Sequence, residues 1–220
     1  MSKPDTREPL DSWRGAFGSD YMGRNAASED TFRQIARAYD RILTTSGIKR
    51  EIGSVLEVGA NIGLKLAGLR RVLGPSVRLS ALEPNPEACA QLRAAKGLAL
   101  AEVLESDGYR IPAPDDSYDL VFTNGVLIHV PPDRLATVMR EICRVSRRYV
   151  LCAEYFSRTP TEIPYRGEAG LLWKRDFGRT YLETCPELRP LSYGFLWEHE
   201  FSHFDDINWW MLSKGSAMAG

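Results

Sequence analysis

Residues 54–63 read Ser-Val-Leu-Glu-Val-Gly-Ala-Asn-Ile-Gly, and this stretch decides the fold. Its apolar first half predicts a short buried strand over 54–58, and the residues that follow predict a turn and then a helix over 62–73. Gly59 lets the backbone turn sharply and lets a ligand approach the main chain, while Gly63 allows close packing where the helix begins.

Strands and helices alternate on the C-terminal side of this stretch. Further strands are predicted over 78–82, near 98–104, over 118–122 and over 148–153, with helices that begin at Pro86 and span 132–145. Strands that are apolar on both faces and separated by helices predict a doubly wound, mostly parallel sheet. Two final strands, 188–197 and 207–214, predict an antiparallel hairpin that completes a seven-stranded, Rossmann-like α/β fold.

The N-terminal part has a different pattern. We expect residues 1–12 to be a frayed leader, whereas the stretch after Trp13 is too apolar for a free tail. Apolar residues at three- and four-residue steps predict a helix over 29–46. We therefore divide the chain into an N-terminal helical lid segment, 1–50, and an α/β domain, 51–220. The domain carries a substrate-lid insertion near 155–177, where two prolines oppose a regular helix.

Composition narrows the class of partner. The chain has 28 basic and 29 acidic residues, a balance that argues against nucleic acid and favours a small-molecule substrate. No apolar run reaches the roughly 20 residues of a membrane span, so we expect no membrane partner and a cytoplasmic protein, either a monomer or a homodimer. The four cysteines are expected to be buried free thiols: Cys89, Cys143, Cys152 and Cys185.

The second predicted strand ends in Glu83, about twenty residues after the glycine turn, where a carboxylate can accept two hydrogen bonds from a ribose diol. Glu57 precedes the turn, and its charge would repel a pyrophosphate but suit a ligand that carries an ammonium and a sulfonium. We therefore favour S-adenosylmethionine over NAD as the cofactor. The alternative is that the glycines only form a turn and that Glu83 is a solvated carboxylate.

The stretch from Val55 to Gly63 resembles the first motif of class I methyltransferases. Asn61 departs from that motif, since a glycine is common there, and we expect it to adopt the left-handed region that asparagine tolerates. The resemblance implies that Asp107, with Gly108, reaches the adenine amino group, and that Asn124 and Gly125 lie at the methionine end. Pro84, beside Glu83, joins the cofactor-binding set. Asp107 as a turn residue and Asn124 as a strand cap are the alternatives.

A narrower family shares more of the chain. Blocks that occur in order over nearly the whole length are Phe17-Gly-Ser-Asp-Tyr21 with Arg24-Asn25, Gly125-Val-Leu-Ile-His129, Glu154-Tyr-Phe156, Tyr165-Arg-Gly167, Lys174-Arg-Asp-Phe177, Tyr193-Gly-Phe195 and Asp205-Asp206. Their succession resembles the methylases associated with pseudaminic acid biosynthesis. The scaffold is also similar to azetidine-2-carboxylate synthases, which make the cofactor's own amine attack its side-chain carbon and expel methylthioadenosine.

Transfer from a sulfonium requires alignment of the nucleophile, exclusion of water and removal of a proton. The catalytic candidates are His129, Glu154, Tyr21, Tyr165 and Asn124. Tyr21 and Arg24 are also cofactor candidates, because arginine binds carboxylates well. The substrate-binding candidates are Tyr155, Arg166, Lys174, Arg175 and Asp176. For these polar residues the alternatives are a packed histidine, structural ion pairs and a solvated face.

A further group of polar residues, His199, Glu200, His203, Asp205 and Asp206, invites a metal interpretation. We expect it in the loop of the terminal hairpin, away from the crevice, and we predict no metal site. The leading hypothesis is a methyltransferase acting on a small metabolite, a sugar or amino-acid derivative of secondary or surface-glycan metabolism. The alternatives are cyclisation of S-adenosylmethionine and, more remotely, a non-catalytic cofactor-binding protein.

Overall fold

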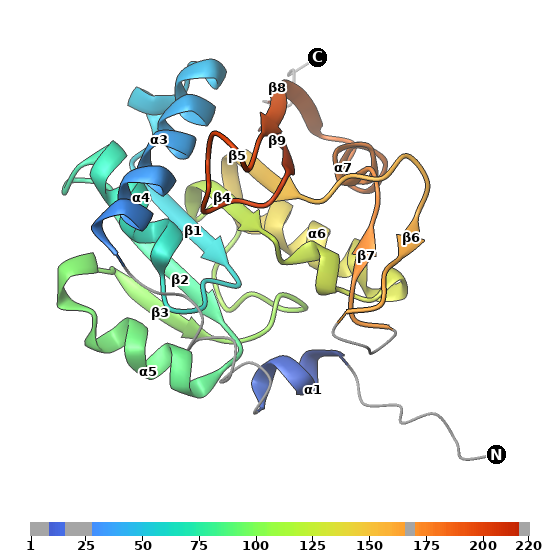
Figure 1. Cartoon of the computed structure of the whole chain (residues 1–220), viewed down its shortest axis with the longest axis horizontal. Helices are drawn as coiled ribbons and strands as arrows, with labels where there is room; N and C mark the ends of the chain where they lie inside the picture. The colour runs from blue at the N-terminus through green and yellow to red at the C-terminus, as the bar shows by residue number, and fades with distance from the viewer. Residues whose placement is uncertain (1–8, 16–27, 166–169, 216–220) are drawn as a thin grey trace.

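The computed structural model describes residues 9–15, 28–165 and 170–215 (Figure 1). Seven strands form one sheet in the order β3-β2-β1-β4-β5-β9-β8. Their bounds are β1 Ser54–Val58, β2 Arg78–Glu83, β3 Glu102–Glu105, β4 Tyr118–Asn124, β5 Ser146–Glu154, β8 Leu188–Leu196 and β9 Ile207–Lys214. The pairs from β3 to β5 are parallel, and β9 is antiparallel to both β5 and β8. The predicted doubly wound sheet with its C-terminal hairpin is confirmed.

Helices cover both faces of the sheet (Figure 1). One face packs against α3 (Glu29–Ser46), α4 (Leu64–Leu73) and α5 (Pro86–Ala94). The other packs against α6 (Pro132–Val145) and α7 (Phe177–Thr184). Successive β1 residues belong to opposite cores, because strand side chains alternate between faces. The helix α3 begins and ends as its sequence indicates, since the Ser28 side chain caps it and Gly47 ends it at φ 73°.

Several elements differ from the sequence prediction. Residues 9–14 are not a frayed leader but a short helix, α1 (Pro9–Arg14). Strand β3 is shorter than expected because residues 96–98 form a 3-10 turn, η2 (Lys96–Leu98). The insertion carries a small hairpin, β6 (Thr161–Glu162) with β7 (Trp173–Lys174), and α7 after it was not predicted. Single short turns such as these leave little periodicity in a sequence. The remaining 3-10 turns are η1 (Lys49–Glu51) and η3 (Leu127–His129).

Strand direction determines which loops meet. The carboxyl ends of parallel strands share one edge of the sheet, and β8, antiparallel to β9, ends at that edge too. The β8–β9 loop, residues 197–206, therefore joins the loops that follow β1, β2, β3 and β4. Our expectation that this loop lies away from the crevice is wrong for this reason.

In the part of the chain that the structure describes, no helix combines the length and apolar character needed to cross a bilayer. All four cysteines are buried and free, as predicted.

Candidate active site

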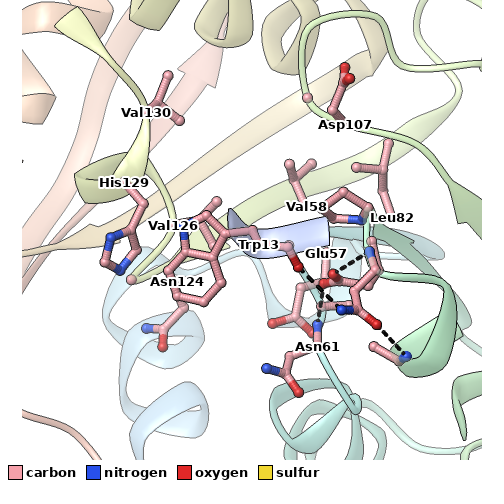
Figure 2. Close-up of a pocket in the computed structure, with 18 of the residues that line it drawn as sticks. Trp13, Glu57, Val58, Asn61, Leu82, Asp107, Asn124, Val126, His129 and Val130 are labelled. Carbon is pink, nitrogen blue, oxygen red and sulfur yellow. Dashed lines mark hydrogen bonds between the residues drawn. The ribbon is translucent and has the colours of Figure 1, made fainter. Parts of the chain in front are cut away.

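A pocket opens at the carboxyl edge of the sheet (Figure 2). Ten of the predicted site residues line it, and these are Glu57, Gly59, Asn61, Glu83, Pro84, Asp107, Gly108, Asn124, Gly125 and His129. Residues that the sequence analysis did not select also line it, among them Leu10, Trp13, Lys65 and Asn85. The pocket therefore brings most of the predicted cofactor residues together and adds a wall from the N-terminal helix.

The turn after β1 has the backbone that its residues permit. Gly59 has φ 76°, and a Cβ built on it would lie 2.6 Å from the Val126 side chain, so this position requires glycine. Asn61 adopts φ 48°, which confirms the expected left-handed conformation, and its Oδ1 accepts from the Ile62 N–H at 2.7 Å. Gly63, at φ 80°, packs near Leu92 and outside the pocket lining.

Glu83 ends β2 with its carboxylate fixed by two backbone donors. The Asn61 N–H donates to Oε2 at 2.8 Å and the Asn85 N–H to Oε1 at 2.9 Å. Burial raises the pKa of Glu83, and these two hydrogen bonds oppose the rise. Each carboxylate oxygen has a second acceptor direction, so the group can take two hydroxyl donors while it holds the turn.

Glu57 lies at the end of β1 with 2% of its surface exposed. Burial raises its pKa well above the usual range, while the positive charge of Lys65 acts in the opposite direction. Its Oε2 has no hydrogen-bond partner among the described residues, and the same holds for Nδ2 of Asn124. A buried polar atom without a partner is costly, so two such atoms in one pocket indicate a polar ligand.

The helix α1 lies across the pocket and is held at two places. Asn85 Nδ2 donates to the Trp13 carbonyl at 3.2 Å, and the Arg14 guanidinium lies 2.7 Å from the Asp107 carboxylate. Asp107 Oδ1 also accepts from the Tyr109 N–H at 3.0 Å. Asp107, expected at the adenine amino group, thus holds α1 in this structure. The apolar character around Trp13 was the sequence signal for this wall.

His129 forms part of an aromatic wall. Its ring lies 4.6 Å from Trp13 and 5.3 Å from Tyr165, measured between ring centroids. Because Nδ1 lies 2.7 Å from the Leu171 carbonyl, which can only accept, we assign the proton to Nδ1 and the lone pair to Nε2. Burial lowers the pKa of His129 to about 4, although the Leu171 carbonyl opposes the shift. The ring is therefore neutral near pH 7.

Glu154 is fully buried and does not line the pocket. Its carboxylate accepts from the backbone N–H groups of Val126, Leu127 and Ile128 at 3.2, 3.1 and 3.4 Å. Burial raises the pKa of Glu154 to about 7, and these hydrogen bonds oppose the rise. The geometry makes Glu154 the acceptor that positions η3 and, through it, His129, instead of a group in contact with a ligand.

The substrate candidates lie outside the pocket lining. Tyr155 donates to Asp205 of the β8–β9 loop, and Lys174 Nζ lies 4.9 Å from the Tyr155 ring centroid. Asp176 caps α7 by accepting from the Arg179 N–H at 2.9 Å. This structural role was not predicted from the sequence. Arg175 is partly buried, and burial lowers its pKa. The candidates Tyr21, Arg24 and Arg166 lie outside the described residues.

The β8–β9 loop reaches the pocket at Lys65. His203 Nε2 lies 2.9 Å from Lys65 Nζ, and the Phe204 ring lies 5.0 Å below it. Burial lowers the pKa of His203 to about 4, with the Lys65 charge adding to the shift. Within residues 9–15, 28–165 and 170–215, no three His, Cys, Asp or Glu side chains converge as metal ligands.

Comparison with known proteins bears directly on this geometry. Residues 55–148 match the family described as methyltransferase domain. This part of the chain is therefore similar to methyltransferase domains. Methyltransferase GfsG of Streptomyces halstedii is 33% identical over 122 residues, 52% of this chain and 40% of that protein, so the match spans about two fifths of this curated relative.

Solved structures share the fold of this chain across most of its length. The 1,6-didemethyltoxoflavin-N1-methyltransferase of Burkholderia thailandensis, solved with 1,6-didemethyltoxoflavin and S-adenosylhomocysteine, has a TM-score of 0.69 at 16% identity and covers 98% of this chain and 94% of its own. The [4+2]-cyclase SpnF has a TM-score of 0.59 at 14% identity over 82% of each chain. The predicted Rossmann-like methyltransferase fold is confirmed, and this fold supports more than one reaction.

Proposed function

We propose that this chain is an S-adenosylmethionine-dependent methyltransferase that acts on a small metabolite, a sugar or amino-acid derivative of secondary or surface-glycan metabolism. One observation carries the proposal: the Glu83 carboxylate is clamped by two backbone N–H groups beside the Gly59 turn. The match of residues 55–148 to the methyltransferase domain family supports the proposal, as does the likeness to methyltransferases of the same fold.

The residues present fit this cofactor. Glu83 would accept from the ribose hydroxyls, the Gly59 turn leaves the backbone open to close approach, and Glu57 has an unsatisfied buried oxygen for a cationic group. Asp107 and Gly108 would face the adenine, and Tyr21 and Arg24 belong to the same proposal as cofactor residues. When bound, S-adenosylmethionine would supply a methyl group on a positively charged sulfur.

The chain's own residues would then exclude water from the pocket and remove the proton of the acceptor. Trp13 on α1 and the ring of Tyr165 flank His129 and exclude water from that side of the pocket. His129, neutral and with Nε2 as its acceptor atom, would take the proton from an acceptor hydroxyl or amine. In this proposal the N-terminal segment 1–50 contributes to the lid through α1, the insertion near 155–177 forms the rest of it, and Tyr155, Arg166 and Lys174 lie toward the acceptor.

A second candidate is intramolecular cyclisation, in which the cofactor's amine attacks its own side-chain carbon, the carbon–sulfur bond breaks, and methylthioadenosine leaves. The aromatic wall of Trp13, His129 and Tyr165 favours it, because three packed rings leave less room for an acceptor on that side of the pocket. The resemblance to azetidine-2-carboxylate synthases points the same way, and the resemblance to pseudaminic acid methylases favours transfer.

Nucleoside products separate the two reactions. Purified protein would be incubated with S-adenosylmethionine, with and without a panel of sugar and amino-acid acceptors, and the products identified by mass spectrometry. We expect S-adenosylhomocysteine only in the presence of an acceptor. Methylthioadenosine without acceptor would instead establish cyclisation, and tight binding without turnover would leave a non-catalytic protein. Binding of a nicotinamide dinucleotide in place of S-adenosylmethionine would overturn the proposal.

A further inference from the structure

One end of the pocket carries an acidic and a basic side chain that influence each other. Glu57 at the tip of β1 and Lys65 in the first turn of α4 both line the pocket, and each acts on the other's charged state. Burial is the main cause of the shift in each pKa, upward for Glu57 and downward for Lys65. Lys65 is the one lysine or arginine among the described residues that line this pocket.

The same end has two polar atoms whose hydrogen bonds are not made. The backbone N–H of Leu66 donates to the Glu57 carboxylate, but Oε2 of Glu57 has no partner in the described part of the chain. Asn124 Nδ2, at the tip of β4, is a donor that likewise has no acceptor among the described residues. Only 2% of the Glu57 surface is exposed, so a buried carboxyl oxygen lies at this end of the pocket without a partner among the described residues.

These groups form a complementary set. A carboxyl oxygen without a partner, a donor amide and a cation match the ammonium and the carboxylate of an α-amino acid. We propose that Lys65 and Asn124 bind the carboxylate of the cofactor's amino-acid group while Glu57 accepts from its ammonium. This inference rests on the proposed function and adds to it a residue, Lys65, that the cofactor motif does not contain.

The β8–β9 loop holds Lys65 in place. A lysine ammonium only donates, so His203 accepts from Nζ through Nε2 at 2.9 Å, and the Phe204 ring lies on another side of the charge at 5.0 Å. The long, flexible lysine side chain is thereby kept on the pocket wall. His203 is a positioning residue that acts through Lys65, and the terminal hairpin contributes to ligand selection.

The test compares two ligands that differ only in the carboxylate, S-adenosylmethionine and decarboxylated S-adenosylmethionine. Calorimetry gives the dissociation constant of each for the full-length protein. For the wild type we expect a preference of about 10- to 100-fold for the carboxylate form, the range for a hydrogen bond between charged groups. In Lys65→Met, which keeps the length of the side chain and removes the charge, this preference falls to about threefold or less.

Two further variants keep the result interpretable. Lys49→Met removes a lysine that pairs with Asp40 far from the pocket, and it leaves the preference unchanged. His203→Leu removes the acceptor and lowers the preference severalfold, whereas His203→Gln, which can accept from Nζ, restores it. A purely structural role for His203 would weaken both ligands equally and would not be rescued by glutamine.

The outcomes separate this inference from the proposed function. If the wild type binds neither ligand, the proposed function fails. If it binds S-adenosylmethionine but Lys65→Met keeps the wild-type preference, the proposed function stands and the assignment of Lys65 is overturned. Equal weakening of both ligands in Lys65→Met would also overturn the assignment, because the loss would then not involve the carboxylate.

Discussion

The inner and outer walls of the pocket are built differently. On the inner wall, the buried Glu83 carboxylate is held by the backbone N–H groups of Asn61 and Asn85, and Glu154, which lies behind this wall, is held by the 126–128 backbone. On the outer wall, side chains meet side chains, as in the Arg14–Asp107 ion pair, in which 46% of the Arg14 side chain is exposed. Backbone donors are fixed by the sheet, whereas exposed ion pairs contribute little. The inner wall is therefore suited to orient a ligand and the outer wall to open.

The largest expected effect is on the inner wall. Glu83→Ala removes the acceptor for two backbone N–H groups and for the ribose, so we expect S-adenosylmethionine binding to weaken at least about 100-fold, near 3 kcal/mol. Titration calorimetry measures it. Glu83→Gln keeps one acceptor oxygen and should retain part of the affinity. Wild-type affinity in the alanine variant would show that the inner wall does not select the ligand.

The next effect concerns stability at different pH values. The pKa of Glu154 is about 7 in the folded protein, above its ordinary value, so the folded state binds the proton more tightly than the unfolded state. Stability should therefore fall as pH rises through the interval between the ordinary value and 7. Relative to Glu154→Gln, which does not titrate, the wild type should lose up to about 3 kcal/mol between pH 5 and pH 8. Urea unfolding at a series of pH values tests this, and parallel curves for the two proteins would contradict it.

His129 lies between the two walls and should affect rate more than binding. His129→Asn keeps a donor for the Leu171 carbonyl but lacks the ring nitrogen that accepts a proton. We expect kcat to fall about 100-fold with the dissociation constant of the cofactor nearly unchanged. Single-turnover kinetics with an identified acceptor provide the measurement. A variant that keeps full kcat would assign the proton to another group.

The smallest effect is expected on the outer wall. Arg14→Ala removes an exposed ion pair worth about 1 kcal/mol or less, so the affinity for the cofactor should change by about fivefold at most. Since Asp107 is then released from α1, the cofactor should associate with the protein faster. Stopped-flow measurement of Trp13 fluorescence gives this association rate. A loss of affinity as large as that of Glu83→Ala would remove the distinction between the walls.

The inner wall could be predicted from sequence because its chemistry follows strand periodicity. Glu57, Gly59, Asn61 and Glu83 sit at fixed offsets from two apolar strands, and the pocket contains all four. The conformation of Asn61 was predictable too, since few other side chains tolerate positive φ.

The outer wall could not be predicted in this way. Trp13 and Lys65 line the pocket and His203 contacts Lys65, but these residues come from segments far apart in the chain, and nothing in their spacing indicates that they meet. The placement of the β8–β9 loop depends on the direction of β8 within the sheet, which two strand patterns alone leave open. Glu154 was selected for its position at a strand end, but its three backbone donors follow from how η3 folds beneath it.

The helix α1 lines the pocket and the β8–β9 loop contacts it at Lys65, although they lie near opposite ends of the numbering. Among the described residues, the two cores of the sheet contain none from α1, whereas the β8–β9 loop contributes Phe201 and Phe204 to one of them. Acceptor range could therefore be altered by exchanging residues 9–15 between related proteins while the ribose-binding strands stay untouched. Because α1 lines the pocket, an affinity tag joined to the N-terminal side of α1 should be removed before any kinetic measurement.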